Sequence, residues 1–191
     1  MTSALDTVED PFITPLLAFL KDAINSDLAP ESPPEPLPET TPEPAVASTV
    51  PHPVAIEMTG ETALPLLSCY RVRSRTRQRT VTYVDRTVTL QFTYVSAATA
   101  REQIEARWPL LERVWVALES ALLEGAHPAH ASGANVLAAL GVIEVPLGTS
   151  QKREGFQPGG DFAYPCFIAE VDLLVQSSSV PDTTHLYPAL S

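Results

Sequence analysis

The sequence predicts an α+β fold, a single small domain in which a mostly antiparallel sheet packs against helices. Residues 87–95 alternate apolar and polar side chains, as in a strand with one buried face. Residues 99–124 instead repeat apolar side chains every three or four positions, as in a helix. The chain has 191 residues, enough for one core domain with flanking segments. We expect an N-terminal amphipathic helix within residues 1–28 that packs on a core of residues 54–176, and a flexible tail at 177–191.

Between the helix and the core, residues 29–53 form an acidic, proline-rich segment. It contains nine prolines among 25 residues, interleaved with four glutamates. Prolines remove backbone donors and the like charges repel one another, so the composition predicts an extended linker. Of the chain's net charge of -11, residues 1–62 carry -10, from eleven acidic residues and one basic residue. The sequence pI of about 4.7 argues against a general affinity for nucleic acid.

The N-terminal helix is expected over residues 12–26. Asp10 is a suitable N-cap, and Pro11 suits the first helical position because its missing N–H has no intrahelical partner there. Apolar side chains then follow helical spacing and predict one buried face. They are Phe12, Leu16, Phe19, Leu20 and Ala23.

Extended segments follow the linker. Residues 54–58 predict a short strand, and a second extended run begins near Leu66. Residues 87–95 give the clearest strand, and a turn is expected near residues 85–86. The apolar face of that strand consists of Val88, Leu90, Phe92 and Tyr94.

Five of the twelve basic residues recur at every second position between residues 71 and 79. This is the side-chain period of a strand, so it predicts that all five guanidinium groups share one face over about 27 Å. Neighbouring charges at this spacing repel by about 0.6 kcal/mol in water, so the stripe cannot lie in the core. The opposite side of residues 74–78 is also polar, which predicts an extended hairpin arm projecting beyond the core.

The arm is a candidate protein–protein interface with acidic partners. A phosphate backbone is an alternative partner, and an exposed hairpin without a binding role is the simplest interpretation. The candidate interface residues are Arg71, Arg73, Arg75, Arg77, Arg79 and Arg86, with Lys152 and Arg153 from a later segment.

The main core helix is expected over residues 99–124. Thr99 and Glu102 match a capping box, and Pro109 should kink the helix or split it in two. Core packing is favoured over a ligand-stacking role for the two tryptophans, because they belong to one apolar stripe. The stripe consists of Ile104, Trp108, Leu111, Trp115, Leu118 and Leu122.

The C-terminal part of the core predicts a short helix at 134–140 and a short strand at 141–148, whose Pro146 suits a sheet edge. Residues 149–161 are polar and contain three glycines, which predicts a surface or interface loop. A closing strand is expected at 167–175. Its buried face consists of Phe167, Ala169, Val171, Leu173 and Val175.

The sequence offers no motif for catalysis, a cofactor or a metal. It lacks a nucleophile elbow, a dinucleotide fingerprint and a phosphate-binding loop, and the close pair His127 and His130 has no further ligand beside it. Cys69 and Cys166 are expected to be small buried residues of a protein made in a reducing cytoplasm. No secretory signal or membrane-spanning segment is expected. A structural or interaction protein is therefore favoured over an enzyme.

The expected order of elements resembles that of the tail terminator proteins of long-tailed bacteriophages. The shared features are an N-terminal amphipathic helix, a short strand after a proline-rich approach, a long hairpin, a tryptophan-bearing helix with an internal proline, and a closing strand after a glycine-rich loop. The resemblance covers roughly residues 10–28 and 53–176 and consists of architecture alone.

The resemblance implies a virion protein assembled in the host cytoplasm. It implies a homo-oligomeric ring, often a hexamer, that caps the tail tube and contacts a neck or head-completion protein. DNA would pass through the ring without sequence-specific binding, and no membrane or cofactor is implied. A head-completion or neck connector protein is the closest alternative. An alternative of another class is a nucleic-acid-binding module that uses the stripe from Arg71 to Arg79.

Overall fold

The computed structural model describes residues 10–29, 44–53, 64–80, 82–97, 101–126, 136–146, 151–159 and 162–178, and for residues 101–107, 124–126, 159, 162 and 178 it describes the backbone alone. These residues form an α+β domain, which confirms the predicted fold class. The elements are α1 (Ile13–Asp27), β1 (Ser48–Val50), β2 (Leu66–Arg79), β3 (Tyr83–Val95), α2 (Arg101–Ala126), α3 (Val136–Ala139), β4 (Val142–Glu144), β5 (Gln151–Gly159) and β6 (Phe162–Ser178).

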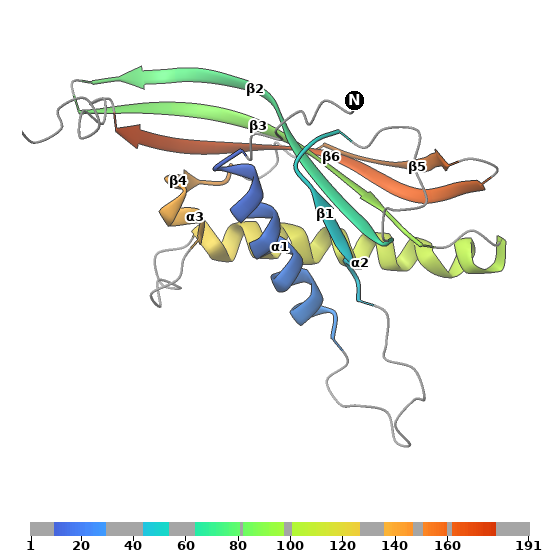
Figure 1. Ribbon diagram of the computed structural model, residues 1–191. Coiled ribbons are helices and arrows are strands. Elements are labelled where there is room, and N and C mark those ends of the chain that lie inside the picture. The colour runs from blue at the N-terminus through green and yellow to red at the C-terminus, as the bar shows by residue number, and fades with distance from the viewer. Residues whose placement is uncertain are drawn as a thin grey trace, which may run out of the picture.

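The six strands form one mixed sheet in the order β1-β2-β3-β6-β4, and β5 pairs with another part of β6. All pairings are antiparallel except that of β1 with β2. The helices lie on one side of this sheet, with α1 and α2 crossing beneath the strands (Figure 1). We call this side the helix face and the opposite side the outer face.

The core lies between the helix face and the helices. The predicted buried residues of β3 and β6 belong to it, which confirms both apolar faces. Trp115 of α2 packs edge-to-face on Phe167 of β6 with ring centroids 5.7 Å apart, and Tyr94 of β3 stacks on the same ring at 5.5 Å. The interpretation of Trp115 as a core residue is therefore confirmed.

Helix α1 begins as the sequence predicts, but its buried face is centred differently. The Asp10 carboxylate accepts hydrogen bonds from the backbone N–H groups of Phe12 (2.9 Å) and Ile13 (3.2 Å). Phe12, Phe19 and Ala23 are only partly buried and border the core. The fully buried positions are Ile13, Leu16, Leu17, Leu20 and Ile24.

Helix α2 runs without interruption from Arg101 to Ala126, so of the two expected effects of Pro109, a kink or a split, the split does not occur. Pro109 is exposed, and the turns on its C-terminal side are held by buried side chains such as Leu111, Trp115 and Leu118. This packing outweighs the loss of one backbone hydrogen bond. The capping box at Thr99 and Glu102 lies outside the described side chains.

The last part of the predicted linker belongs to the folded body, which corrects its boundary at residue 53. Strand β1 pairs with residues 66–68 of β2, and Val46 before it is fully buried. The Asn25 side chain of α1 also bonds both backbone groups of Val46, at 2.8 and 2.9 Å. This segment was misassigned because neighbouring prolines dominate its composition. Residues 30–43 and the strand expected at 54–58 lie outside the described residues.

Two further expectations are wrong. Residues 151–159 form strand β5 and not a loop, because β6 is long enough to pair with them. The β2–β3 connection lies between Arg79 and Tyr83, whereas Asp85 and Arg86 belong to β3. Thr80 closes this connection, since its backbone N–H donates to the Tyr83 carbonyl at 2.8 Å.

Candidate protein interface on the arginine arm

The arm consists of β2 from Arg71 to Arg79, β3 from Tyr83 to Thr89, and β6 from Asp172 to Ser178. It extends past the end of α2 at the left of Figure 1. The sequence predicted a two-stranded hairpin here, but β6 adds a third strand that pairs with β3 along the whole arm, and the short strand β4 pairs with β6 at Leu174 and Val175. The third strand shields one edge of β3, so β2 is the edge strand.

The β2 strand of the arm is open to solvent. Every residue from Arg71 to Arg79 is exposed. Strand β1 covers only residues 66–68, so among the described strands nothing pairs with the outer edge of β2 beyond Ser68. The prediction that this stretch projects beyond the core is confirmed.

The prediction that all five arginines share one face is wrong, because β2 contains two β-bulges. Between Arg71 and Arg73, β2 advances by two residues while β3 advances by one, and the same shift occurs between Thr76 and Gln78. Each extra residue moves all later side chains to the opposite face of the sheet. The even spacing of the arginines along the sequence therefore does not give an even stripe in space.

The register assigns each arginine to a face through its partner on β3, which has no bulge against β6. Arg71 pairs with Leu90 and Arg79 with Val84, so both lie on the helix face. Arg73 and Arg75 pair with Thr89 and Thr87 and lie on the outer face, while Arg77 is the extra residue of the second bulge. Arg86 of β3 pairs with Thr76 and joins the helix face. Bulges and charges of this kind also prevent unwanted strand pairing at a sheet edge.

Arg71 has a structural role. Its guanidinium nitrogen lies 3.6 Å from the Asp10 carboxylate that caps α1, and its Cζ lies 5.8 Å from the centre of the Phe12 ring. Both contacts are made by partly exposed side chains. Arg71 therefore ties the start of α1 to the sheet and is not a free interface cation.

Arg73 is also engaged within the chain. Its Nε donates to the Thr89 hydroxyl at 2.9 Å, and that hydroxyl donates to the Asp172 carboxylate at 2.5 Å. The three groups form a hydrogen-bonded row across β2, β3 and β6 on the outer face. The negative charge of Asp172 partly offsets the positive charge of Arg73.

The guanidinium groups of the remaining arm arginines are unengaged, which means that they have no partner among the described residues. Within the described part of the chain, the guanidinium groups of Arg75, Arg77, Arg79 and Arg86 form no ion pair or hydrogen bond, and all four residues are exposed. Nearby, Asp85 accepts a hydrogen bond from the Gln176 side chain at 2.9 Å. The end of the arm is therefore strongly basic.

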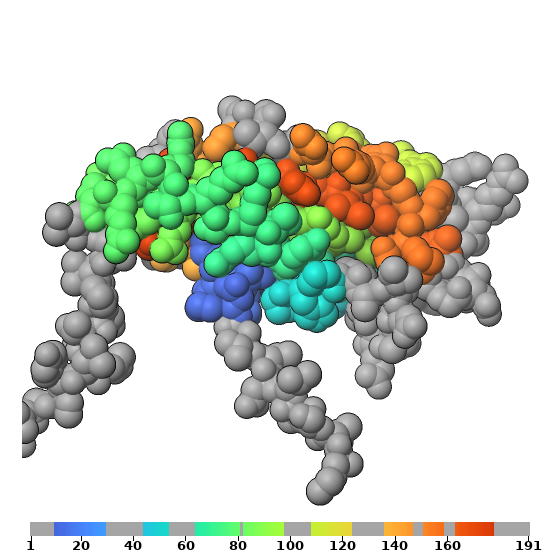
Figure 2. All heavy atoms as spheres, turned by 90° about the horizontal axis from the view of Figure 1, so that it is seen from above, coloured from blue at the N-terminus to red at the C-terminus, as the bar shows by residue number. Residues whose placement is uncertain are grey.

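The two remaining candidates lie away from the arm. Figure 2 shows the arm at one end of the outer face and β5 toward the other. Lys152 and Arg153 both belong to β5. Lys152 lies on the helix face and forms ion pairs with Glu112 and Glu154. Burial opposes its charge, but the hydrogen bonds to both carboxylates raise its pKa above the ordinary value. Arg153 is exposed beside Ile168 and Glu170. The structure thus separates these two residues from the arm.

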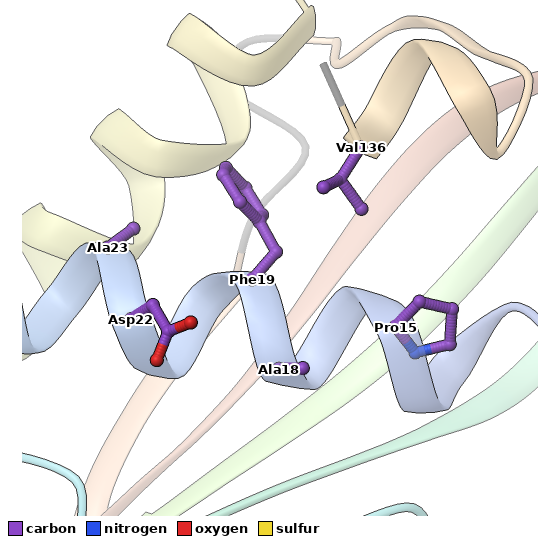
Figure 3. Close-up of a pocket in the computed structure, with 6 residues that line it drawn as sticks. All are labelled: Pro15, Ala18, Phe19, Asp22, Ala23 and Val136. Carbon is purple, nitrogen blue, oxygen red and sulfur yellow. The ribbon is translucent and has the colours of Figure 1, made fainter. Parts of the chain in front are cut away.

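A second surface feature, which the sequence did not indicate, is a groove of about 440 Å³ along α1. The Phe19 ring projects from α1, Val136 at the start of α3 lies to one side of it, and Pro15, Ala18 and Asp22 are exposed residues of the lining (Figure 3). The lining is mostly apolar and includes one carboxylate. Such a groove can contribute contact area to a partner.

The described residues contain few groups with unusual chemistry. Burial raises the pKa of Cys166 to about 11, and burial, with a smaller effect of Asp10, raises the pKa of Cys69 still further. Both thiols are free and buried, as predicted. No described group of three or more His, Cys, Asp or Glu side chains is arranged to hold a metal ion. No helix in the described ranges is long and apolar enough to cross a membrane.

Neither the known protein families nor the curated proteins compared with this chain include a match.

Proposed function

We propose that this protein is a structural subunit that assembles through its arm, and specifically a phage tail terminator that forms a ring capping the tail tube. The observation that carries the proposal is the group of exposed, unengaged arginines at the end of the arm, Arg75, Arg77, Arg79 and Arg86. Arranged on an edge strand that extends past the helices, they suit contact with an acidic protein surface.

The order of elements supports the specific assignment. The chain has an N-terminal helix, a strand after a proline-rich approach, a long β2–β3 hairpin, a tryptophan-bearing helix with an internal proline, and a closing strand. The N-terminal helix, the long hairpin, the tryptophan-bearing helix and the closing strand follow the order expected of a tail terminator, whereas strand β5 takes the place of the expected glycine-rich loop. In that role the partners are other copies of the chain, the tail tube protein and a neck or head-completion protein, and the site of action is the virion. A head-completion or neck connector protein is the nearest alternative.

Nucleic-acid binding is a second candidate function, favoured by the same four arginines. If all four contact phosphates, affinity should fall with salt with a log–log slope of roughly -3.6. The overall acidity of the chain opposes this role, because a net charge of -11 repels nucleic acid at longer range.

The test is the oligomeric state of the purified protein, measured by light scattering and by negative-stain imaging. The proposal predicts closed rings, and it predicts that the rings bind the ends of tail tubes. A monomer that binds DNA with steep salt dependence would contradict the ring and support the second candidate.

A further inference from the structure

The two bulges give the arm arginines an arrangement that a single docking surface does not explain. Arg75 lies on the outer face, whereas Arg79 and Arg86 lie on the helix face. Their β3 partners, Thr87 and Val84, are three residues apart, so Arg75 and Arg79 are about 10 Å apart along the sheet. Because the β2 edge between them is unpaired within the described sheet, this strand is accessible from both faces and from its side.

The chain is also strongly divided in charge. Residues 71–86 contain six arginines and one aspartate and so have a net charge of +5. Because the whole chain has a net charge of -11, the residues outside this segment have a net charge of -16. Outside the arm the chain is therefore acidic on balance, so a second copy has a net charge of opposite sign to that of the arm. Contact between two β2 edges would instead place arginines opposite arginines, which disfavours a symmetric two-fold pair and favours head-to-tail contact.

We propose that the arm of one copy inserts between acidic surfaces of neighbouring copies, with Arg75 against one wall and Arg79 and Arg86 against the other. The occupant of both faces of the arm is thus another copy of the same chain. This inference rests on the proposed function, since it describes how the subunits of the ring are joined. Head-to-tail contacts of this kind close into a ring when the rotation between subunits allows it.

The arrangement predicts that each face of the arm contributes to assembly separately. Arg75→Glu reverses the charge on the outer face, and Arg79→Glu and Arg86→Glu reverse it on the helix face. Each change replaces an attraction by a repulsion, so each should weaken self-association by about tenfold at low salt. The effect should shrink at high salt, because exposed charges are screened within about 10 Å at 0.1 M.

Arg153→Glu is the matched control. Arg153 is an exposed arginine on the outer face, but it lies on β5, away from the arm. The same Arg→Glu change gives this variant the same net charge as each arm variant. It should assemble like the wild type. Circular dichroism and thermal unfolding of each variant establish that the fold is retained.

The experiment is mass photometry or analytical ultracentrifugation of the full-length chain over a range of salt concentrations. Weakened assembly of variants on both faces, with a normal control, is the expected result. Weakening by Arg75→Glu alone, or by the helix-face variants alone, would overturn insertion in favour of docking on one face. Normal rings in all variants would show that the arm is not part of the interface and would overturn its insertion, while the proposed ring would be retained. A monomeric wild type would overturn both proposals.

Discussion

Arg71 and Arg75 are neighbours in the same alternating sequence, yet the structure gives them different roles. Arg71 contacts Asp10 and Phe12 at the start of α1, whereas the Arg75 side chain has no described partner. We therefore expect Arg71→Ala to destabilise the fold and Arg75→Ala to leave it unchanged. The two variants lose the same charge and a side chain of the same size, so each is a control for the other.

The magnitude follows from the exposure of the contacts. The side chains of Arg71 and Asp10 are 43% and 35% exposed, so solvent screens their ion pair and limits it to about 0.2–1 kcal/mol. The contact with Phe12 contributes about 0.5–1 kcal/mol at such a site. Arg71→Ala should thus lower the free energy of unfolding by about 1 kcal/mol, and Arg75→Ala should change it by less than about 0.5 kcal/mol.

Urea denaturation followed by far-ultraviolet circular dichroism measures this difference. A loss of about 1 kcal/mol moves the unfolding midpoint by roughly 0.5 M for a typical slope. Equal midpoints for Arg71→Ala and Arg75→Ala, or a larger loss for Arg75→Ala, would refute the assignment of Arg71 to the fold and of Arg75 to the interface.

Three further predictions concern the fold. Asp10→Ala should cost about 1–2 kcal/mol because it removes the α1 cap, whereas Asp10→Asn should retain most of the stability, and urea midpoints compare them. Trp115→Ala should lower the free energy of unfolding by about 3–5 kcal/mol because the ring is buried. Trp108→Ala should lower it by less because Trp108 is half-buried, and thermal unfolding compares the two variants. The pKa of Cys166 is raised from 9.0 to about 11, and that of Cys69 is raised as well, so the unfolded chain releases these thiol protons first. This contribution to stability is fully present below pH 9.0 and is lost as pH rises toward about 11, so alkaline denaturation of Cys166→Ala should be less steep.

The sequence predicted the elements whose pattern is regular. Strand β3 alternates at residues 88–94 and has the expected buried face. In α2 the expected residues Leu111, Trp115, Leu118 and Leu122 are buried and Trp108 is half-buried, while the Ile104 side chain lies outside the described ones. Elements that depend on a partner were harder to predict. Strand β5 has glycines and polar residues and is held by its pairing with β6. Strand β1 has three residues among prolines and is held by its pairing with β2, while Asn25 bonds the backbone of Val46 just before it.

The candidate site was predicted in part. Exposure of residues 71–79 follows from their composition, but the bulges depend on the register between β2 and β3, which the spacing of the arginines does not contain. For the same reason the sequence did not show that Arg71 pairs with Asp10, 61 positions earlier, or that Lys152 pairs with Glu112 of α2. Whether a basic residue has a structural role or remains available for a partner thus depends on side chains that are distant in the sequence.

The most direct test of the central claim is cryo-electron microscopy of the assembled protein. The proposed ring predicts a closed particle in which each arm lies between neighbouring subunits, with Arg75 and Arg79 facing acidic side chains on opposite walls. A particle in which the arms point into solvent, or a protein that remains monomeric at every concentration imaged, would contradict it.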